Sequence, residues 1–166
     1  MALMREGVPE TMAYVDLFDT LSIGDYYRTD AHWRQERILP VAKKLATAMG
    51  AGENLPGEAA YESRERSPFY GGYWGQSALN AQPDTLVYLE SEYTRNAVVT
   101  SAEKPGQTLP VYTLDRFEGM DGYDVFLDGA ATILTVECEN AKTDRELILF
   151  RDSSASSLAP LLLGAY

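Results

Sequence analysis

A strand-like run, Glu146-Leu147-Ile148-Leu149-Phe150, is followed by a serine-rich turn at residues 151–157 and by a second apolar run from Leu158 to Ala165. A continuous apolar run of this length is typical of a buried strand in a parallel sheet. The run after the turn indicates a helix. Strand, polar turn and helix in this order make half of an α/β crossover unit. We therefore expect an α/β core with a serine cluster at the C-terminal edge of one strand.

A helix and several short strands are expected before this unit. A helix is predicted to follow the Asp30 region and to run to Met49, because apolar residues recur at helical spacing from Ile38 to Met49 and Gly50 marks an end. Pro40 lies inside the pattern and lacks a backbone donor, so we expect a kink or a restart there. Short β-like runs separated by turn residues follow at residues 85–89, 97–100, 110–114, 123–127 and 132–136. The sequence thus predicts one domain over residues 1–166, with a mixed β portion in the middle and a candidate insertion at about 55–121.

The balance of charge argues against some classes of partner. The chain carries 14 Lys and Arg against 25 Asp and Glu, a formal net charge of −11. A field of that sign repels phosphate backbones and anionic lipid, so we expect no nucleic-acid partner. No apolar run approaches the roughly 20 residues of a membrane-spanning helix, so we expect no membrane insertion within this chain.

Histidine and cysteine occur once each, as His32 and Cys138. A single cysteine allows no disulfide within the chain, and a single histidine allows no multi-histidine metal site. We expect neither a metal nor another cofactor. Chemistry that needs an imidazole must use His32.

Asp30 and His32 lie two residues apart at the predicted start of the helix. A carboxylate so placed can accept a hydrogen bond from one imidazole nitrogen and fix the tautomer, which leaves the other nitrogen to take a proton from a hydroxyl. The alternative is purely structural: Asp30 caps the helix and His32 lies in its first turn.

Asp152, Ser153 and Ser154 occupy the turn after the predicted strand. A serine there has its hydroxyl at the sheet edge, and nearby backbone N–H groups could stabilise an oxyanion. Capping of the following helix is the alternative, since Ser and Asp are common N-caps. Together, a serine of this turn, His32 and Asp30 supply the three residue types of a nucleophilic triad, which follows no fixed order along the chain.

An aromatic segment, Phe69-Tyr70-Gly71-Gly72-Tyr73-Trp74, lies between the two polar motifs. Aromatic faces beside polar groups suit stacking on sugar rings. Candidate substrate contacts are therefore Tyr27, Trp33, Tyr73 and Trp74, and ordinary packing is the alternative for each.

The segment Tyr26-Tyr27-Arg28-Thr29-Asp30-Ala31-His32-Trp33 resembles the motif that names the DHHW proteins, a bacterial family. Residues 69–71, 122–129 and 147–166 are similar to further parts of the same family. More distantly, the Asp-x-His-Trp and Asp-Ser elements are similar to those of bacterial proteins that O-acetylate alginate, which have an SGNH-hydrolase-like fold. Ala31 and Ser154 differ from the residues usual at these two positions, and the chain ends where family members continue with a further strand.

The resemblance implies a three-layer α/β/α core and a segment of a longer, exported or cell-envelope-associated protein. It implies that Ser153 is the nucleophile, His32 the general base and Asp30 its orienting acid. Ser154 and Asn140 are the implied oxyanion residues.

Two functions are expected from these residues. The first is serine-dependent acyl transfer by an O-acetyltransferase or acetylesterase that acts on a carbohydrate or cell-envelope polymer. The second is a non-catalytic surface or glycan- or protein-binding module on the same scaffold. The distance between Ser153 and His32 discriminates between them.

Overall fold

The computed structural model describes residues 7–77 and 80–166, and it combines short helices with two small antiparallel sheets. The α-helices are α2 (Leu39–Ala48), α3 (Gly72–Ser77), α4 (Glu92–Asn96) and α5 (Ala155–Leu158). The strands are β1 (Glu62–Phe69), β2 (Asp84–Glu90), β3 (Val98–Ser101), β4 (Thr108–Leu109) and β5 (Leu134–Glu137). Single 3₁₀ turns connect them, among which η5 (Leu114–Glu118), η6 (Gly122–Val125) and η7 (Ala159–Leu162) matter below. The expected mixture of helix and strand is therefore present.

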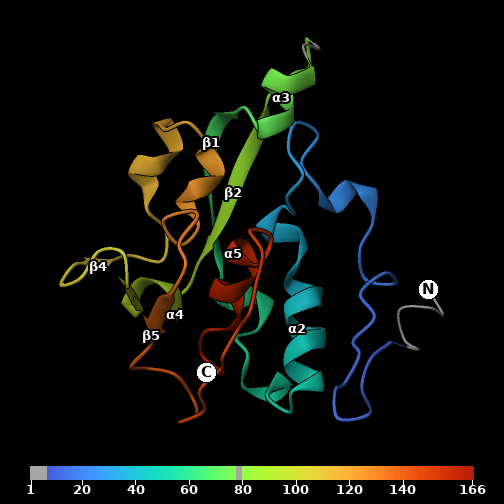
Figure 1. Cartoon of the computed structure of the whole chain (residues 1–166), viewed down its shortest axis with the longest axis vertical. Coiled ribbons are helices and arrows are strands. Elements are labelled where there is room, and N and C mark those ends of the chain that lie inside the picture. Colours follow the sequence, from blue (N-terminus) through green and yellow to red (C-terminus); the bar gives the residue numbers. More distant parts are fainter. Residues whose placement is uncertain (1–6, 78–79) are drawn as a thin grey trace.

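The larger sheet element is an antiparallel pair of β1 and β2 that leads up to α3 (Figure 1). Glu62 pairs with Glu90 at one end and Phe69 with Asp84 at the other, with an irregularity between Arg66 and Phe69. Nearly all of β1 is exposed, whereas the middle of β2 is buried. The apolar side chains of β2 thus hold the pair on the molecule.

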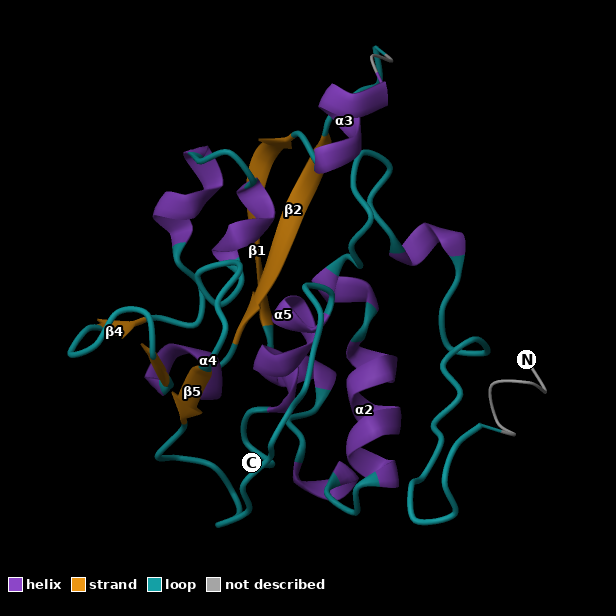
Figure 2. Ribbon diagram, in the orientation of Figure 1, coloured by secondary structure: helices purple, strands orange, loops and turns teal. Residues whose placement is uncertain are grey.

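The second sheet has the strand order β4-β3-β5, and both pairings are antiparallel. Figure 2 shows it on the opposite side of the molecule from α2, with α5 between them. The three-layer α/β/α core stays a prediction.

Buried side chains form two clusters that together make the core. The first collects aromatic and β-branched residues around β2, β3 and η6, among them Phe69, Tyr123 and Phe126. The second collects Ile38, just before α2, and Val41 and Ala46 of α2 with leucines from the end of the chain. The apolar stripe of α2 therefore packs on the C-terminal turns, as its helical spacing predicts.

The predicted helix is shorter than expected at its start. It begins at Leu39, directly after the 3₁₀ turn η2 (Gln35–Arg37), so Pro40 stands in a first turn, where a missing N–H costs nothing. Of the two expectations at Pro40, the restart is therefore confirmed and the kink is wrong. Gly50 adopts a φ of 73° just past the helix, as expected for a glycine that ends one.

Residues 146–150, expected to form a buried strand, adopt no regular secondary structure. Ile148 and Phe150 are 83% and 95% exposed. A parallel strand is buried by the elements that cover both faces of its sheet, whereas no strand of either described sheet pairs with this segment and only its Leu147 packs on the α2 cluster. The following helix is present as α5 and η7.

Two further β-like runs, at residues 110–114 and 123–127, are joined only by a single bridge between Tyr112 and Phe126, and residues 122–125 form η6 instead. In residues 7–77 and 80–166, none of the helices combines the length and apolar character needed to cross a bilayer.

Candidate active site

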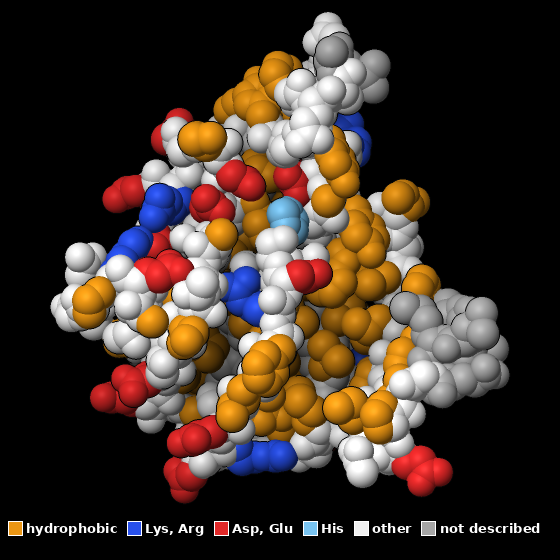
Figure 3. Space-filling model, in the orientation of Figure 1, with side chains coloured by type: hydrophobic (Ala, Val, Ile, Leu, Met, Phe, Trp, Pro, Cys, Tyr) orange, Lys and Arg blue, Asp and Glu red, His pale blue; other side chains and the backbone are white. Residues whose placement is uncertain are grey.

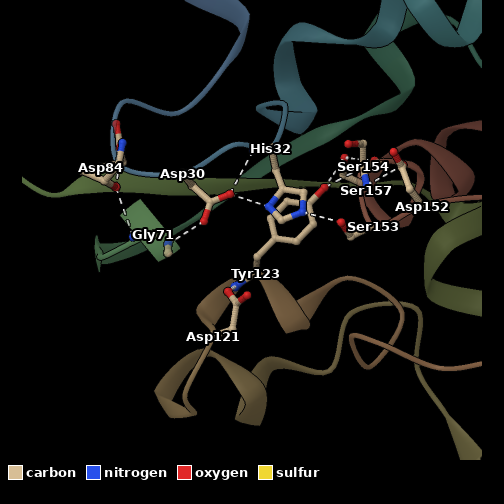
Figure 4. A network of polar contacts seen from close by, with 12 residues as sticks. Asp30, His32, Gly71, Asp84, Asp121, Tyr123, Asp152, Ser153, Ser154 and Ser157 are labelled. Carbon is tan, nitrogen blue, oxygen red and sulfur yellow. Dashed lines mark hydrogen bonds and ion pairs between the residues drawn. The ribbon is translucent and has the colours of Figure 1, made fainter. Parts of the chain in front are cut away.

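His32 and Ser153 meet although they are far apart in the sequence. The Nε2 atom of His32 lies 2.8 Å from the Oγ atom of Ser153 (Figure 4). His32 belongs to a tight loop closed by the bridge between Tyr26 and Trp33. Ser153 stands just before α5, in the turn after the exposed segment 146–150. The distance is that of a hydrogen bond in which the hydroxyl donates to the ring nitrogen.

Asp30 holds the other side of the imidazole. Its Oδ1 atom contacts His32 Nδ1 at short range and also accepts a hydrogen bond of 2.9 Å from the backbone N–H of His32. Its Oδ2 atom accepts a bond of 2.8 Å from the N–H of Gly72, at the start of α3. With Nδ1–H donating to the carboxylate, Nε2 is left as the acceptor that faces Ser153.

The environment of Asp30 keeps its carboxyl ionised. Asp30 is only 5% exposed. Burial by itself raises the pKa of this carboxyl, but hydrogen bonds from the His32 ring and from the N–H groups of Gly72 and His32 outweigh burial, so the pKa lies below its ordinary value. A carboxylate in this state can orient the ring and stabilise an imidazolium.

The loop that carries Asp30 is fixed by its neighbour Thr29. Asp84, the first residue of β2, accepts hydrogen bonds from the N–H and the hydroxyl of Thr29 at 2.8 and 2.7 Å. Gly71 donates its N–H to the same hydroxyl oxygen at 3.1 Å. A Cβ on Gly71 would lie 2.3 Å from Asp30 Cβ and 2.4 Å from the carbonyl oxygen of Thr29. Only glycine therefore lets this segment approach the aspartate.

Tyr123 covers one face of the imidazole. The ring centroids of His32 and Tyr123 are 3.8 Å apart, with an angle of 8° between the planes. The Tyr123 hydroxyl lies 2.9 Å from Ser157 Oγ in α5. Burial is the largest cause that raises the pKa of this phenol, so the group stays protonated and can donate.

The turn that carries Ser153 is held by its own side chains. Asp152 Oδ1 accepts a hydrogen bond of 3.0 Å from the N–H of Ser154. Arg151 donates to Ser156 Oγ at 2.7 Å. Ser154 lies beside Ser153 as predicted, but its N–H already has an acceptor, so an oxyanion would have to displace Asp152 there.

Asn140 is not brought to this site. It stands in the turn after β5, where its Oδ1 atom lies 3.2 Å from Cys138 Sγ, and it does not line the cavity that contains Ser153 and His32. The expectation that Asn140 assists at an oxyanion is therefore not supported by its position. The chain after Asn140 turns back to pair Lys142 with Gly164 instead.

The predicted substrate-contacting aromatics divide into two pairs. Tyr27 is only 4% exposed and packs edge-on against Phe69, so the expectation that it contacts substrate is wrong. Trp33 is half-buried against the α2 cluster. Tyr73 and Trp74 are 52% and 36% exposed on α3, whose first residue, Gly72, donates to Asp30. These two are accessible to a ligand.

A cavity of about 1200 Å³ has His32 and Ser153 in its wall. Asp121, Asp124 and Asp152 line the same cavity, and most of its remaining wall is apolar. The other charged residues in the wall are three acids and two cations: Glu103, Glu137, Glu146, Arg145 and Arg151. In Figure 3 the pale blue imidazole lies on the visible face with acidic side chains around it and an apolar area beside it. No group of three or more His, Cys, Asp or Glu suited to a metal ion occurs among the described residues.

Sequence reasoning missed Tyr123, Asp84 and the pair Gly71–Gly72. Tyr123 was expected within a short strand, and no local pattern marks its contact with His32. The adjacent glycines were the one available signal, because a glycine pair often marks a close approach of the backbone.

A search of solved structures finds a DHHW family protein from Eubacterium siraeum that is similar to this chain, with a TM-score of 0.68 and 21% sequence identity. The match covers 84% of this chain and 47% of that protein, so the chain spans about half the length of that structure. No family model and no curated protein sequence matches. The likeness shows a shared fold.

Proposed function

We propose that the chain carries out serine-dependent acyl transfer, as an acetylesterase or an O-acetyltransferase that acts on a carbohydrate or cell-envelope polymer. The single observation that carries the proposal is the continuous line from the Asp30 carboxylate through the His32 ring to the Ser153 hydroxyl. Helix capping, the alternative for both motifs, requires no contact between them. Helix capping also does not require that Asp30 fix the tautomer of the His32 ring.

The proposed reaction begins with proton transfer from Ser153 Oγ to His32 Nε2. The oxygen attacks the carbonyl carbon of an ester, and the carbonyl electron pair moves to the oxygen of a tetrahedral intermediate. The intermediate collapses by breaking the bond to the leaving alcohol, which takes the proton from the imidazolium. Asp30 stabilises that imidazolium and does not itself take the proton.

The second half of the proposed reaction regenerates the serine. Water or a sugar hydroxyl enters the cavity and gives its proton to His32 Nε2 as its oxygen attacks the acyl carbon. Collapse breaks the bond to Ser153 Oγ, which recovers the proton. Water as acceptor gives an esterase, and a sugar hydroxyl gives a transferase. Tyr73 and Trp74 are exposed near Asp30 and suit stacking on a sugar ring.

The finer resemblances belong to the same proposal. The Asp-x-His-Trp and Asp-Ser motifs support the likeness to alginate-acetylating proteins and the three-layer SGNH-like core, and the resemblance to DHHW proteins supports an exported or cell-envelope location. The shared fold with a DHHW family protein is compatible with each of them.

A non-catalytic glycan-binding module is the second candidate. The observation that favours it is the N–H of Ser154, which is engaged by Asp152 and so is not free for an oxyanion. Under this reading the exposed aromatics of α3 bind the ligand, and the residues around Ser153 only hold the turn.

The test compares the chain with Ser153→Ala and His32→Ala in hydrolysis of 4-nitrophenyl acetate and in labelling by a fluorophosphonate. Loss of either residue is expected to reduce turnover by a factor on the order of 10⁴, because triad members act as a unit. Ser63→Ala, on the exposed strand β1, is the matched control. Turnover or labelling that survives Ser153→Ala would rule out the enzyme and favour the binding module.

A further inference from the structure

Tyr123 contacts the proposed general base, His32, and the segment that follows the proposed nucleophile, Ser153. Its ring lies parallel to the imidazole of His32 at 3.8 Å. Its hydroxyl donates to Ser157 Oγ at 2.9 Å and lies 3.4 Å from the carbonyl oxygen of Ser154. Both acceptors belong to the turn and helix that immediately follow Ser153. One rigid side chain thus spans from the general base to the segment of the nucleophile.

Tyr123 is held in place by packing and by hydrogen bonds. The side chain is 3% exposed and packs on Phe126 with ring centroids 5.0 Å apart. Its backbone N–H donates to Asp121 Oδ1 at 2.9 Å, which caps η6. A residue held at its backbone, its ring and its hydroxyl can impose its geometry on a neighbour that is held less firmly.

His32 needs that support because its hydrogen bonds alone do not fix the plane of the ring. Bonds to Asp30 and Ser153 lie at the two nitrogens and roughly define one axis through the ring. If the ring tilts about this axis, the lone pair of Nε2 turns away from the Ser153 hydroxyl. A parallel tyrosine face at 3.8 Å blocks that tilt, and it also presents π-electron density to the imidazolium that forms during the reaction.

We infer that Tyr123 is a positioning residue of the proposed acyl-transfer site, which sets the plane of the His32 ring and its distance from Ser153. The inference rests on the proposed function for its kinetic consequence only. The orientation of the ring is a property of the folded chain and can be measured without any substrate.

Two substitutions separate the ring from the hydroxyl. Tyr123→Phe keeps the stack and loses the bond to Ser157, so we expect kcat to change by about threefold at most. Tyr123→Leu keeps apolar volume and loses the stack, so we expect kcat to fall by about tenfold to a hundredfold with KM little changed, because misplacement of a catalytic group acts on the chemical step. Tyr88→Leu removes another buried tyrosine, in β2, and controls for general loss of stability.

Nuclear magnetic resonance of the imidazole gives the readout that does not depend on activity. His32 is the only histidine of the chain, so every imidazole nitrogen and carbon-bound proton signal belongs to it. In the unsubstituted protein we expect a single tautomer, protonated at Nδ1, with ring protons shifted upfield by the tyrosine ring current. The upfield shift should persist in Tyr123→Phe and Tyr88→Leu and disappear in Tyr123→Leu.

The outcomes distinguish the two proposals. Absence of the upfield shift in the unsubstituted protein, or an unchanged kcat in Tyr123→Leu, would overturn the role of Tyr123 whatever Ser153 does. A fall in kcat no larger than that of Tyr88→Leu would do the same. Ser153→Ala could leave turnover intact while the His32 ring signals respond to Tyr123→Leu as expected. In that case the acyl-transfer proposal fails, and the inference that Tyr123 positions the His32 ring is retained. The measurement on the unsubstituted protein applies even if Tyr123→Leu does not fold.

Discussion

At the scale of single residues, the site depends on the glycines beside Asp30 as much as on its functional side chains. The Asp30 carboxylate is buried, and a buried charge is tolerated only when it is paired and hydrogen-bonded. The donor that completes it is the N–H of Gly72, which reaches the carboxylate because Gly71 has no Cβ. The buried carboxylate of Asp30 therefore requires the close approach of residues 71–72, which supply one of its hydrogen bonds.

Gly71→Ala is expected to damage both stability and activity. The new Cβ would stand 2.3 Å from Asp30 Cβ and 2.4 Å from a backbone oxygen, so the loop or α3 must move. Overpacking of this kind costs about 1–3 kcal/mol. The same movement should slow fluorophosphonate labelling of Ser153 by about tenfold or more, since Asp30 loses its place beside the ring. Urea unfolding and labelling rates measure the two effects.

Gly75→Ala is the matched control for that substitution. Gly75 also belongs to α3, and a Cβ there meets nothing within 4 Å. Alanine favours a helix over glycine by about 1 kcal/mol, so this variant should be as stable as the unsubstituted protein or slightly more so. Equal behaviour of the two alanine variants would show that the close approach at Gly71 does not matter.

At the scale of elements, the segment that carries Tyr123 is tied to its surroundings by Asp128. Leu127, Asp128 and Gly129 follow η6 with φ values of 54°, 59° and 80°. Asp128 forms ion pairs with Lys104, in the connection after β3, and with Arg116 of η5, whose Nε lies 2.8 Å away. Burial by itself raises the pKa of Asp128, but the hydrogen bonds and charges of the two cations lower it below its ordinary value.

Asp128→Asn should therefore cost stability in a way that depends on pH. A lowered pKa in the folded state stabilises the fold above the ordinary aspartate pKa of about 3.9, and this contribution is lost as the pH falls through the folded-state value. Both cations are partly exposed, so we expect the asparagine variant to be about 1 kcal/mol less stable near pH 7. The difference should close in acid. Asparagine tolerates the left-handed backbone, which leaves charge as the main change.

Urea unfolding at several pH values checks this expectation. The exposed Asp144→Asn makes the same change of net charge and serves as the control. A stability difference that stays constant between pH 7 and pH 3, or one matched by Asp144→Asn, would contradict the role of the ion pairs.

Elements with a local signal were predictable, and those that depend on distant partners were not. The apolar spacing of Ile38, Val41 and Ala46 and the stop at Gly50 identified α2 without any tertiary information. The apolar run at residues 146–150 indicated a strand, but a strand exists only where another supplies its hydrogen bonds. His32 could be named from the sequence because histidine occurs once, and the turn pointed to a serine, which the resemblance to a known family narrowed to Ser153. The stacking partner of His32 could not be named, since a ring contact leaves no trace in local spacing.

At the scale of the whole molecule, the site lies where the two core clusters meet. Tyr123 belongs to the cluster around β2, β3 and η6, whereas Leu158 of α5 belongs to the cluster around α2. The Gln35 side chain joins them, because it donates to the Ser157 carbonyl beside Leu158 at 2.7 Å and accepts from the hydroxyl of Tyr112, in the first cluster, at 3.2 Å. His32 and Ser153 therefore come into contact only when both clusters have formed, which couples the site to the complete fold.

The charge of the molecule makes a prediction about the esters that the site accepts. The net charge is −11, and Asp121, Asp124 and Asp152 line the cavity beside His32 and Ser153. An acidic wall concentrates cations and repels anions over roughly 10 Å at 0.1 M salt. Among phenyl acetates matched in leaving group, one with a trimethylammonium substituent should therefore have a higher kcat/KM than one with a carboxylate, by about tenfold at low ionic strength.

The same wall dictates how that preference responds to salt and to substitution. Screening should reduce it steadily toward 1 M salt, where the Debye length is about 3 Å. Asp121→Asn should reduce it at low salt, because it removes a charge from the cavity and leaves an oxygen to accept the N–H of Tyr123. Glu65→Gln, which removes one charge from the exposed strand β1, should leave the preference almost unchanged if the local wall decides it. An equal loss of this preference in the two variants would instead assign it to the net charge of the molecule. Equal kcat/KM for the two esters at low salt would show that the acidic wall does not face the acyl donor.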